Sequence, residues 1–371
     1  DELSDRSIPG YHLDAVMDGE RAATLPSDLR SLAINAGRIR LDGTDPLDLD
    51  PVQERVQVLV REVEHLWTCC FELEEAGHEA GDETAERNST RSAESIRSGR
   101  WWLRRALSAL SSLRELLQSP LVDAATSGVL AVTGPAGSGK SHVLAHAASA
   151  GLKRGHPVVL VLGEHFHGAG PACMEVLRLL GNPGPTFWEH LNDLASGQGR
   201  KAVVMVDALN ETDDGSFWLR HFRVFLRFMK DCPNTSLVFS VRSEYLDDVL
   251  PKGALNALPT VEHHGFEDVP PHQLNRVFGA YGLDGPRALP VQRELLNPLM
   301  LHLVCRGLQD GGAVGLDDLP EGSLALWRFI IEDVNDRLAS PQRLDFDGDA
   351  NVVGDALRVI GAELWNAQEV A

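Results

Sequence analysis

The chain has 371 residues, enough for two or three domains with a sizeable core, which excludes a disulfide-stapled miniprotein. Hydrophobic residues make up 43% and charged residues 24% of the sequence, a composition typical of a folded globular chain. The formal net charge of −20 repels polyanions, so we expect no general binding of nucleic acid. No apolar run approaches the roughly 20 residues of a membrane helix, and we expect no membrane partner.

The cysteines and the first residue bear on the setting of the chain. The five cysteines form neither a CxxC pair nor a Cys and His spacing typical of zinc sites, which favours a reducing cytoplasm. The chain opens on Asp1 instead of methionine, so we expect it to be a portion of a larger protein.

The N-terminal region, residues 1–98, is expected to contain helices and a linker. Residues 1–50 are rich in Asp, Gly, Pro and Leu without a sustained period, which favours loops and short helices. From Pro51 onwards apolar residues recur at alternating steps of four and three, a spacing that predicts an amphipathic helix ending near Gly77. The polar stretch over 77–98 is interpreted as a mobile linker, because it offers almost nothing to bury.

A second amphipathic helix is predicted over most of the connecting segment 99–125. Its leucines recur at helical spacing from Leu103 to Leu117, and Pro120 ends it. After it, short apolar runs alternate with helical patterns, which is typical of a parallel sheet with crossover helices. We therefore predict an α/β domain over 126–268, built on a mainly parallel five-stranded sheet.

The elements expected in this domain and after it are as follows. Strands are expected at 128–133, 157–162, 202–207, 236–241 and 260–264. Helices of the same domain are expected near 141–150, 173–180, 187–195 and 216–230. The remaining sequence shows only helical patterns, which predict helices at 273–281, 291–308, 324–338 and 352–365. We assign 269–345 to a helical domain and 346–371 to the start of another domain.

One loop between a predicted strand and a predicted helix carries the strongest signal. It satisfies GxxxxGK[ST], and the amide groups of such a P-loop curl around the α- and β-phosphates of a nucleotide at a helix N-terminus. Lys140 is expected to bind the β- and γ-phosphates, and the Ser141 hydroxyl is expected to bind Mg²⁺. The predicted ligand is therefore ATP or ADP with Mg²⁺. The residues expected to contact it are Gly134, Pro135, Ala136, Gly137, Ser138, Gly139, Lys140, Ser141 and His142.

A P-loop needs an acidic residue for its metal ion, and Asp207 is the candidate. It ends the apolar run that begins at Val203, so it emerges at the carboxyl edge of a buried strand, where α/β sheets bind ligands. Asp207 is therefore predicted to bind Mg²⁺, with a helix cap or a loop acid as the alternative. Glu211 lies just beyond it and is a candidate base or water-orienting group, with a merely solvated acid as the alternative.

Arg242 follows the next predicted strand. An arginine at the carboxyl edge of a strand beside a P-loop can contact the γ-phosphate and report its presence. The alternative is an ion pair with Glu244 or another nearby acid. The predicted catalytic residues are thus Lys140, Asp207, Glu211 and Arg242.

Together these residues resemble the STAND class of P-loop ATPases, and within it the NACHT-like modules of bacterial antiviral Avs-type proteins. The run Val206–Glu211 resembles the extended Walker B motif of that class, and the strand ending at Arg242 resembles its sensor 1. In the helical part, the run from Leu296 to Met300 resembles the proline motif, which implies that Pro298 packs near the adenine. The resemblance covers about 99–338.

The resemblance implies a regulatory switch. ADP is held between the sheet and the helical domain, trigger binding opens the two halves, ATP replaces ADP, and the open form assembles into a homo-oligomer that activates an effector outside this segment. The implied trigger is a phage component or another protein bound outside the segment, and slow ATP hydrolysis resets the switch.

The resemblance also implies that 346–371 begins a winged-helix domain. Such domains carry a phosphate-contacting histidine. His263, His264 and His302 do not fall where that histidine would lie, so we interpret them as ordinary structural residues.

Two other functions would use the same phosphate cradle. An AAA+-type motor or loader acting on nucleic acid or protein would share the P-loop, Asp207 and the sensor strand, but the net charge of −20 offers no basic track for DNA. A small-molecule kinase is disfavoured, because the sequence after Asp207 shows no acceptor pocket and the helical appendage would have no role.

Overall fold

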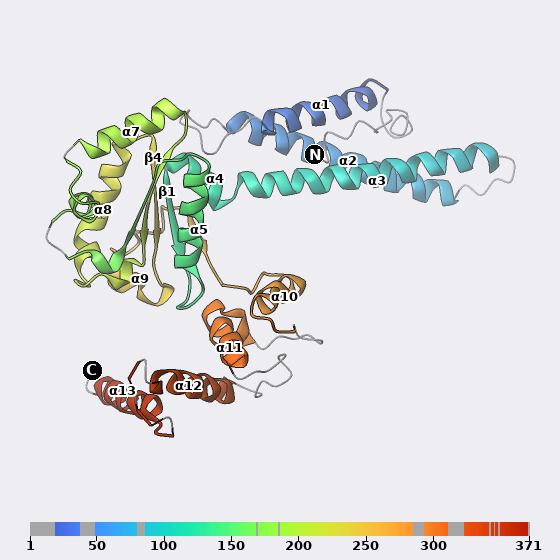
Figure 1. The fold of residues 1–371 in the computed structure, drawn as a ribbon. Coiled ribbons are helices and arrows are strands. Elements are labelled where there is room, and N and C mark those ends of the chain that lie inside the picture. The colour runs from blue at the N-terminus through green and yellow to red at the C-terminus, as the bar shows by residue number, and fades with distance from the viewer. Residues whose placement is uncertain are drawn as a thin grey trace.

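The chain forms an N-terminal helical bundle, a central α/β domain and a C-terminal helical module (Figure 1). The computed structural model describes residues 19–37, 49–79, 86–167, 170–184, 186–284, 293–310, 323–340, 343–344, 346–347 and 349–369. Each of the three parts has its own cluster of buried apolar side chains. Across the described residues, we find no helix with the length and apolar character needed to cross a membrane.

The bundle consists of α1 (Gly19–Gly37), α2 (Asp50–Glu79) and α3 (Glu86–Leu117). α2 and α3 pack side by side and extend away from the α/β domain (Figure 1). The apolar stripe predicted from Pro51 onwards is confirmed, because Leu59 and Val63 of α2 are fully buried against Leu103 and Leu110 of α3. Apolar residues spaced three and four positions apart thus form one continuous core between two long helices.

Two predictions for this region are wrong. The linker expected over 77–98 is helical from Glu86 onwards, while 80–85 lie outside the described residues. A polar stretch signals that nothing is buried, but Glu, Arg and Ala are good helix formers that can continue a helix packed elsewhere. The loops and short helices expected over 1–50 include the 19-residue helix α1, although 1–18 and 38–48 lie outside the described residues.

The α/β domain is built on a parallel sheet with the strand order β2-β3-β4-β1-β5. The strands are β1 (Val129–Thr133), β2 (Val158–Leu162), β3 (Ala202–Asp207), β4 (Thr235–Ser240) and β5 (Thr260–Glu262). All described pairings are parallel, which confirms the predicted five-stranded sheet. The order places β1 beside β4, and β4 beside β3, so the carboxyl ends of these three strands are neighbours.

Helices cover both faces of the sheet, as the apolar strands require. The helices of this domain are α4 (Pro120–Ser127), α5 (Lys140–Lys153), α6 (Ala172–Leu179), α7 (Phe187–Gln198), α8 (Phe217–Lys230) and α9 (Leu246–Val249). α5 packs Leu144 onto Val132 and Met205 on one face. The other face carries the larger core, in which Trp218 and Phe239 are almost fully buried beneath α6, α7 and α8.

The helical module lies beyond the carboxyl edge of the sheet (Figure 1). It contains α10 (Pro271–Ala280), the short 3-10 helix η6 (Arg293–Leu296), α11 (Pro298–Asp310), α12 (Ser323–Ala339) and α13 (Val352–Glu369). Its core joins Phe278 of α10 to Val304 of α11 and Leu326 of α12. The predicted helices are confirmed, except that the one expected over 291–308 is divided at Asn297 into η6 and α11.

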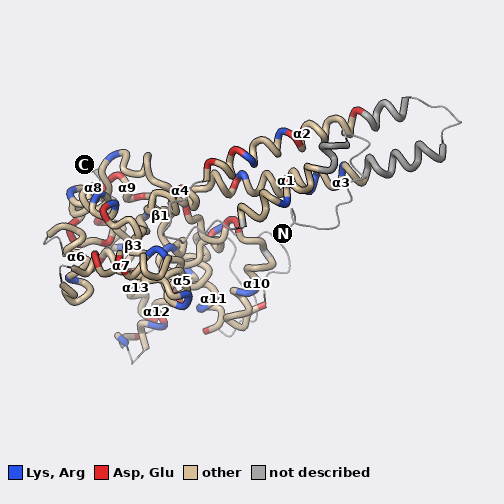
Figure 2. The backbone as a smooth tube through the Cα atoms, turned by 90° about the horizontal axis from the view of Figure 1, so that it is seen from above, with Lys and Arg blue, Asp and Glu red and all other residues tan. Residues whose placement is uncertain are grey.

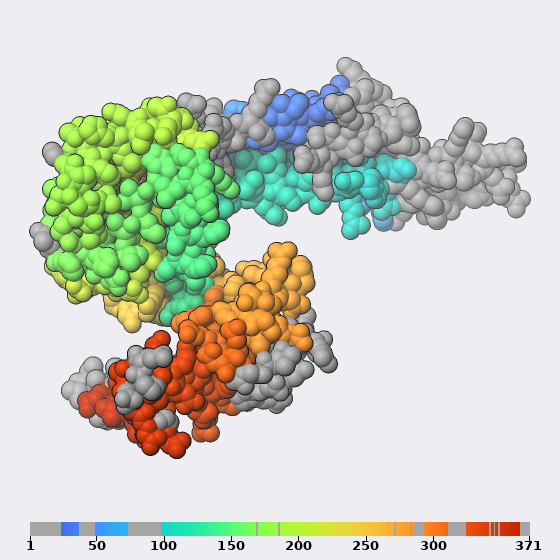
Figure 3. Space-filling view, in the orientation of Figure 1, coloured from blue at the N-terminus to red at the C-terminus, as the bar shows by residue number. Residues whose placement is uncertain are grey.

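The outline of the described parts is open on one side. Figure 3 shows the bundle and the helical module projecting from the α/β domain with space between them. Figure 2 shows basic and acidic residues interspersed over the described parts of the bundle and the α/β domain. In that view the net charge of −20 does not gather into a single acidic face.

Candidate functional site

The loop with the GxxxxGK[ST] pattern connects β1 to α5, at the carboxyl edge of the sheet. This is the strand, loop and helix context that the pattern requires. α5 begins at Lys140, and Gly139 before it adopts a left-handed conformation with a φ of 98°. The loop therefore meets the N-terminus of α5, where a helix has free amide groups and the positive end of its dipole. Ser141 and His142 are exposed on the first turn of this helix.

Lys140 is buried inside the loop, with 8% of its surface exposed. Its Nζ donates to the carbonyl oxygens of Gly134 and Pro135, both at 2.8 Å, and to Ser138 Oγ at 3.4 Å. Burial lowers the pKa of the Lys140 ammonium below its ordinary value of 10.5. Neutral acceptors therefore hold the ammonium group at the centre of the loop. A charged phosphate oxygen would attract it more strongly than these acceptors do.

The charged groups that act on Lys140 are Glu244 and three of the predicted catalytic residues. Glu244, Asp207 and Glu211 act on the Lys140 ammonium in the direction that raises its pKa, and Arg242 acts in the direction that lowers it. The ends of β3 and β4 thus place Asp207, Glu211 and Arg242 at the same edge of the sheet as Lys140. Glu244, predicted from the sequence only as an alternative ion-pair partner of Arg242, is the acid with the largest effect on the pKa of Lys140.

Asp207 is buried at the end of β3, with 4% of its surface exposed. The Ser240 hydroxyl, at the end of β4, donates to Asp207 Oδ1 at 2.5 Å and accepts from the Ala208 amide at 2.7 Å. Ser240 therefore fixes one carboxylate oxygen and leaves the other for a ligand. Ser240 was not among the predicted site residues, because the sequence does not show that β4 pairs with β3.

Glu211 and Arg242 form an ion pair. Arg242 Nη2 donates to Glu211 Oε1 at 2.5 Å, and the Arg242 backbone amide donates to Asn210 Oδ1 at 3.0 Å. This is the ion-pair alternative for Arg242, with Glu211 as the acid instead of Glu244. Both side chains remain more than one third exposed, so the pair is open to exchange with a solvent molecule or a ligand.

The donor set fits Mg²⁺ bound together with a phosphate. Ser141 offers a hydroxyl and Asp207 a carboxylate, both oxygen ligands, and Mg²⁺ in proteins keeps several waters and phosphate oxygens around one or two such groups. Within the described residues no cluster of three or more His, Cys, Asp or Glu side chains could hold a metal ion. A zinc site built from protein ligands alone is therefore not present in that part of the chain.

The loop also fits a phosphate in its backbone. At Gly137 the φ is +73°, and an added Cβ would lie 2.9 Å from Asn297 Oδ1 and 2.9 Å from Leu299 Cβ. A side chain at this position would therefore be strained and would collide with the helical module. The glycine lets the loop curl tightly between α5 and the module, which is the concave shape that a row of amides needs to surround an anion.

Pro298 packs on the loop and on the segment after β5. An added Cβ at Gly139 would lie 3.6 Å from Pro298 Cγ, and one at Gly265 would lie 2.6 Å from Pro298 Cδ. The module is joined to the same segment by the Phe266 amide, which donates to the Leu296 carbonyl at 2.8 Å. A cavity of about 210 Å³ borders this contact, lined by Pro135, His264, Glu267, Arg293, Glu294, Leu296 and Asn297.

His263 lies directly beside the loop. Its backbone amide donates to the Thr133 carbonyl at 2.8 Å, which extends the β1 and β5 pairing into the loop. Its Nε2 would lie 3.6 Å from a Cβ added at Gly139. Burial and the charge of Lys140 lower the pKa of the His263 ring, and a hydrogen bond with the Ser138 backbone opposes the shift.

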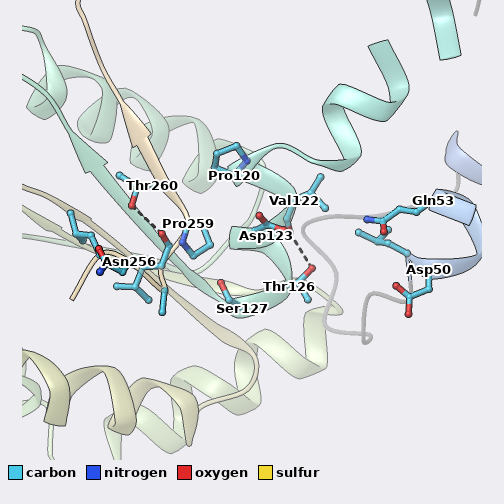
Figure 4. A pocket seen from close by; sticks show the side chains of 14 residues that line it. Asp50, Gln53, Pro120, Val122, Asp123, Thr126, Ser127, Asn256, Pro259 and Thr260 are labelled. Carbon is cyan, nitrogen blue, oxygen red and sulfur yellow. Dashed lines mark hydrogen bonds between the residues drawn. The ribbon is translucent and has the colours of Figure 1, made fainter. Parts of the chain in front are cut away.

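A larger cavity of about 830 Å³ lies at the opposite edge of the sheet (Figure 4). Residues from the start of α2, from α4 and from the approach to β5 line it, among them Asp50, Asp123, Asn256 and Thr260. It shares no lining residue with the P-loop. This cavity is therefore not part of the candidate phosphate site.

Comparisons with known proteins add little to this geometry. No protein-family model matches the sequence, and neither does any curated protein. Among solved structures 15 chains match. The AMPPCP-bound DnaA from Aquifex aeolicus is 13% identical with a TM-score of 0.28, over 69% of this chain and 87% of that chain. PCH-2 from C. elegans is 12% identical with a TM-score of 0.27, over 58% of this chain and 62% of that chain. Likenesses at these TM-scores carry no conclusion about function.

Proposed function

We propose that the chain binds ATP or ADP with Mg²⁺ at the loop between β1 and α5, and that it hydrolyses ATP slowly. One observation carries this proposal: Lys140 is buried within a P-loop at the carboxyl edge of the sheet, where β3 ends at Asp207 and Arg242 follows β4. A glycine-rich turn without a ligand would have no reason to bury an ammonium group among neutral acceptors.

Each residue has a role that its position supports. Lys140 would bind the β- and γ-phosphates, and the amides of the loop would bind the α- and β-phosphates. Ser141 and Asp207 would hold Mg²⁺, which supplies charge neutralisation for the phosphates when bound. Pro298 would pack near the adenine, as the resemblance to the STAND class implies.

Glu211 would orient the attacking water, and Arg242 would contact the γ-phosphate. In the structure these two side chains are engaged with each other. While Arg242 holds the Glu211 carboxylate, neither group is available for its proposed partner. The ion pair therefore supports a low basal rate of hydrolysis that rises only when Arg242 turns towards another anion.

The wider role that we propose is a STAND-like or NACHT-like regulatory switch in bacterial anti-phage immunity. Nucleotide exchange would change the arrangement of the α/β domain and the helical module, and the activated form would assemble into a homo-oligomer. The contact between the module and the P-loop supports such coupling, because the loop proposed to bind the nucleotide contacts the module directly. The trigger and the effector would lie outside this segment.

The first test is calorimetric titration of the wild type and of Lys140→Ala with ADP and ATP in the presence of Mg²⁺. Loss of a charge-assisted contact predicts binding weaker by about 10- to 100-fold or more in Lys140→Ala. Lys153→Ala is the matched control, because Lys153 is an exposed lysine in the last turn of the same helix. Absence of heat with the wild type, or an affinity of Lys140→Ala within a few-fold of it, would overturn the proposal.

Measurements of retained nucleotide and of ATP turnover on the wild-type protein distinguish a switch from a motor. Tightly retained ADP with almost no turnover supports the switch. Continuous ATP hydrolysis that DNA stimulates supports an AAA+-type motor instead.

A further inference from the structure

The first turn of α11 is hydrogen-bonded to the outer side of the P-loop. Asn297 Nδ2 donates to the Ala136 carbonyl at 2.9 Å, and the Leu299 backbone amide donates to the Gly137 carbonyl at 3.2 Å. These acceptors are the carbonyls of two consecutive loop residues. The helical module thus holds the loop by its backbone, at the positions where its amides are expected to meet phosphate.

Peptide geometry converts this contact into an orientation of the loop amides. A peptide unit is planar and trans, so the carbonyl of one residue and the amide of the next point in opposite directions. Holding the carbonyls of Ala136 and Gly137 towards the module therefore turns the amides of Gly137 and Ser138 away from it. The Ser138 amide donates to the Pro135 carbonyl at 3.3 Å, the same acceptor that Lys140 Nζ approaches at 2.8 Å. The amide and the ammonium consequently face one point inside the loop.

The orientation of the Asn297 side chain is fixed by its second role. Its Oδ1 accepts from the backbone amides of Leu299 at 3.0 Å and Met300 at 3.3 Å, which caps the N-terminus of α11. With the oxygen occupied in this way, the amide nitrogen must point at the loop. One side chain therefore caps a helix and holds the P-loop at the same time.

α11 itself is firmly placed in the module. Leu301, Val304 and Cys305 on this helix are buried in the core that joins α10, α11 and α12. A displacement of the module would thus carry the donors of Asn297 and Leu299 away from the loop, and the loop carbonyls would lose their partners.

We propose that Asn297 is a positioning residue for the phosphate site, which preorganises the loop amides and links nucleotide affinity to the docking of the helical module. The inference rests on the proposed nucleotide binding. Because linkage is reciprocal, a bound nucleotide stabilises the docked module by the same factor by which docking raises nucleotide affinity. The module then responds to the nucleotide through the loop backbone.

Asn297→Ser separates the two roles of the side chain. Serine is as good a helix cap as asparagine, but its hydroxyl lacks an amide donor that could reach the loop while its oxygen accepts from the helix. The substitution is neutral, so it adds no repulsion of phosphate. Asn351→Ser is the matched control, because Asn351 Oδ1 accepts from the Gly354 amide at the start of α13, away from the loop.

Two measurements test the proposal. Affinity for ADP with Mg²⁺ by titration calorimetry is expected to fall by about 3- to 10-fold in Asn297→Ser, the effect of losing one hydrogen bond, and to stay unchanged in Asn351→Ser. Amide hydrogen exchange without nucleotide is expected to become faster at Gly137 and Ser138 in Asn297→Ser, while the α11 core keeps its protection.

The outcomes distinguish the two proposals. If the wild type binds no nucleotide, the proposed function fails, and the exchange measurement still decides whether Asn297 orders the loop. If the wild type binds and Asn297→Ser binds within twofold of it, or if loop exchange is unchanged, the positioning role of Asn297 is wrong. Faster exchange throughout α11 would show a lost helix cap instead and would also overturn the proposal.

Discussion

At the scale of single residues, His263 shows how the site sets the charge of a side chain. His263 directly follows β5, and its ring lies beside Gly139 of the P-loop, half-buried and near the ammonium of Lys140. Burial, the charge of Lys140 and the neighbouring His264 all lower the pKa of His263 from its ordinary value of 6.5, and the hydrogen bond with the Ser138 backbone only partly opposes them. His263 is therefore neutral at pH 7.

This pKa shift predicts a pH-dependent stability of the unliganded protein. Between the lowered pKa of the folded state and the ordinary value of 6.5, the unfolded chain binds more protons at this residue, so protonation favours unfolding. The contribution of His263 to stability is therefore fully present above pH 6.5, and it is progressively lost as the pH falls through the folded-state pKa of this residue. His263→Gln, which does not titrate, should lose less stability over this range.

The measurement is thermal unfolding followed by circular dichroism from about pH 5 to pH 8. The wild type and His263→Gln should differ in the slope of melting temperature against pH, on the acid side only. His146→Gln is the control, because His146 is exposed on α5 and is not among the groups that shift the pKa of His263. Parallel curves for the wild type and His263→Gln would show that His263 has the same pKa in both states.

The sequence predicted the site residues that belong to a recognisable motif, Pro298 among them, and did not predict two others that reach the site through the fold. Lys140 and Ser141 stand in a fixed pattern within one loop, and Asp207 ends an apolar strand, so their placement follows from neighbours in the chain. His263 and Asn297 lie 123 and 157 positions after Lys140, and only the closure of the sheet and the docking of the module bring them to the loop. No local spacing encodes that meeting.

At the scale of elements, the ends of β2 and β3 meet more closely than any side chain would allow. Ala208, directly after Asp207, has a left-handed conformation with a φ of 54°, which costs roughly 1 kcal/mol for a residue other than glycine. An added Cβ at Gly163, directly after β2, would lie only 2.1 Å from the Ala208 carbonyl oxygen. The strained turn and the glycine together fix the position of Asp207.

Gly163→Ala should therefore destabilise the α/β domain and disturb the metal ligand. Because the obstacle is backbone and not a flexible side chain, the loss in the free energy of unfolding is expected to be about 2 kcal/mol or more. Urea unfolding measures it, and ATP hydrolysis should fall together with it as Asp207 shifts. Gly215→Ala is the control, since nothing lies within 4 Å of a Cβ at Gly215. Equal midpoints for the two variants would contradict the close approach.

The existence of the strands could be predicted, whereas their order could not. Each strand is recognisable in the sequence as a short apolar run between turn residues, and all five lie within a few positions of the expected ranges. The order β2-β3-β4-β1-β5 depends on pairings between segments far apart in sequence, for which one sequence offers no signal. The segment from Glu86 failed for a different reason, because polar composition excludes burial but not helix formation.

At the scale of the whole molecule, the three separate cores divide the chain into parts that differ in their connection to the site. The bundle reaches the α/β domain through α4, whose Val122 belongs to the bundle core. The helical module reaches it through Asn297 and Leu299 at the P-loop. Destabilising the module should therefore lower nucleotide affinity, whereas an equal destabilisation of the bundle should leave it unchanged.

Leu110→Ala and Leu301→Ala test this division as a matched pair. Leu110 lies in α3 with 0% of its surface exposed, and Leu301 lies in α11 with 1% exposed. Each substitution should cost about 2 to 5 kcal/mol in the part that contains it, because it opens a cavity in a packed core. Hydrogen exchange should locate the loss in the bundle for Leu110→Ala and in the module for Leu301→Ala.

Affinity for ADP with Mg²⁺ should fall only in Leu301→Ala, since only α11 holds the loop that binds phosphate. An equal fall in both variants would mean that the bundle and the α/β domain unfold as one cooperative unit, and that the contact between α11 and the loop has no special part in binding.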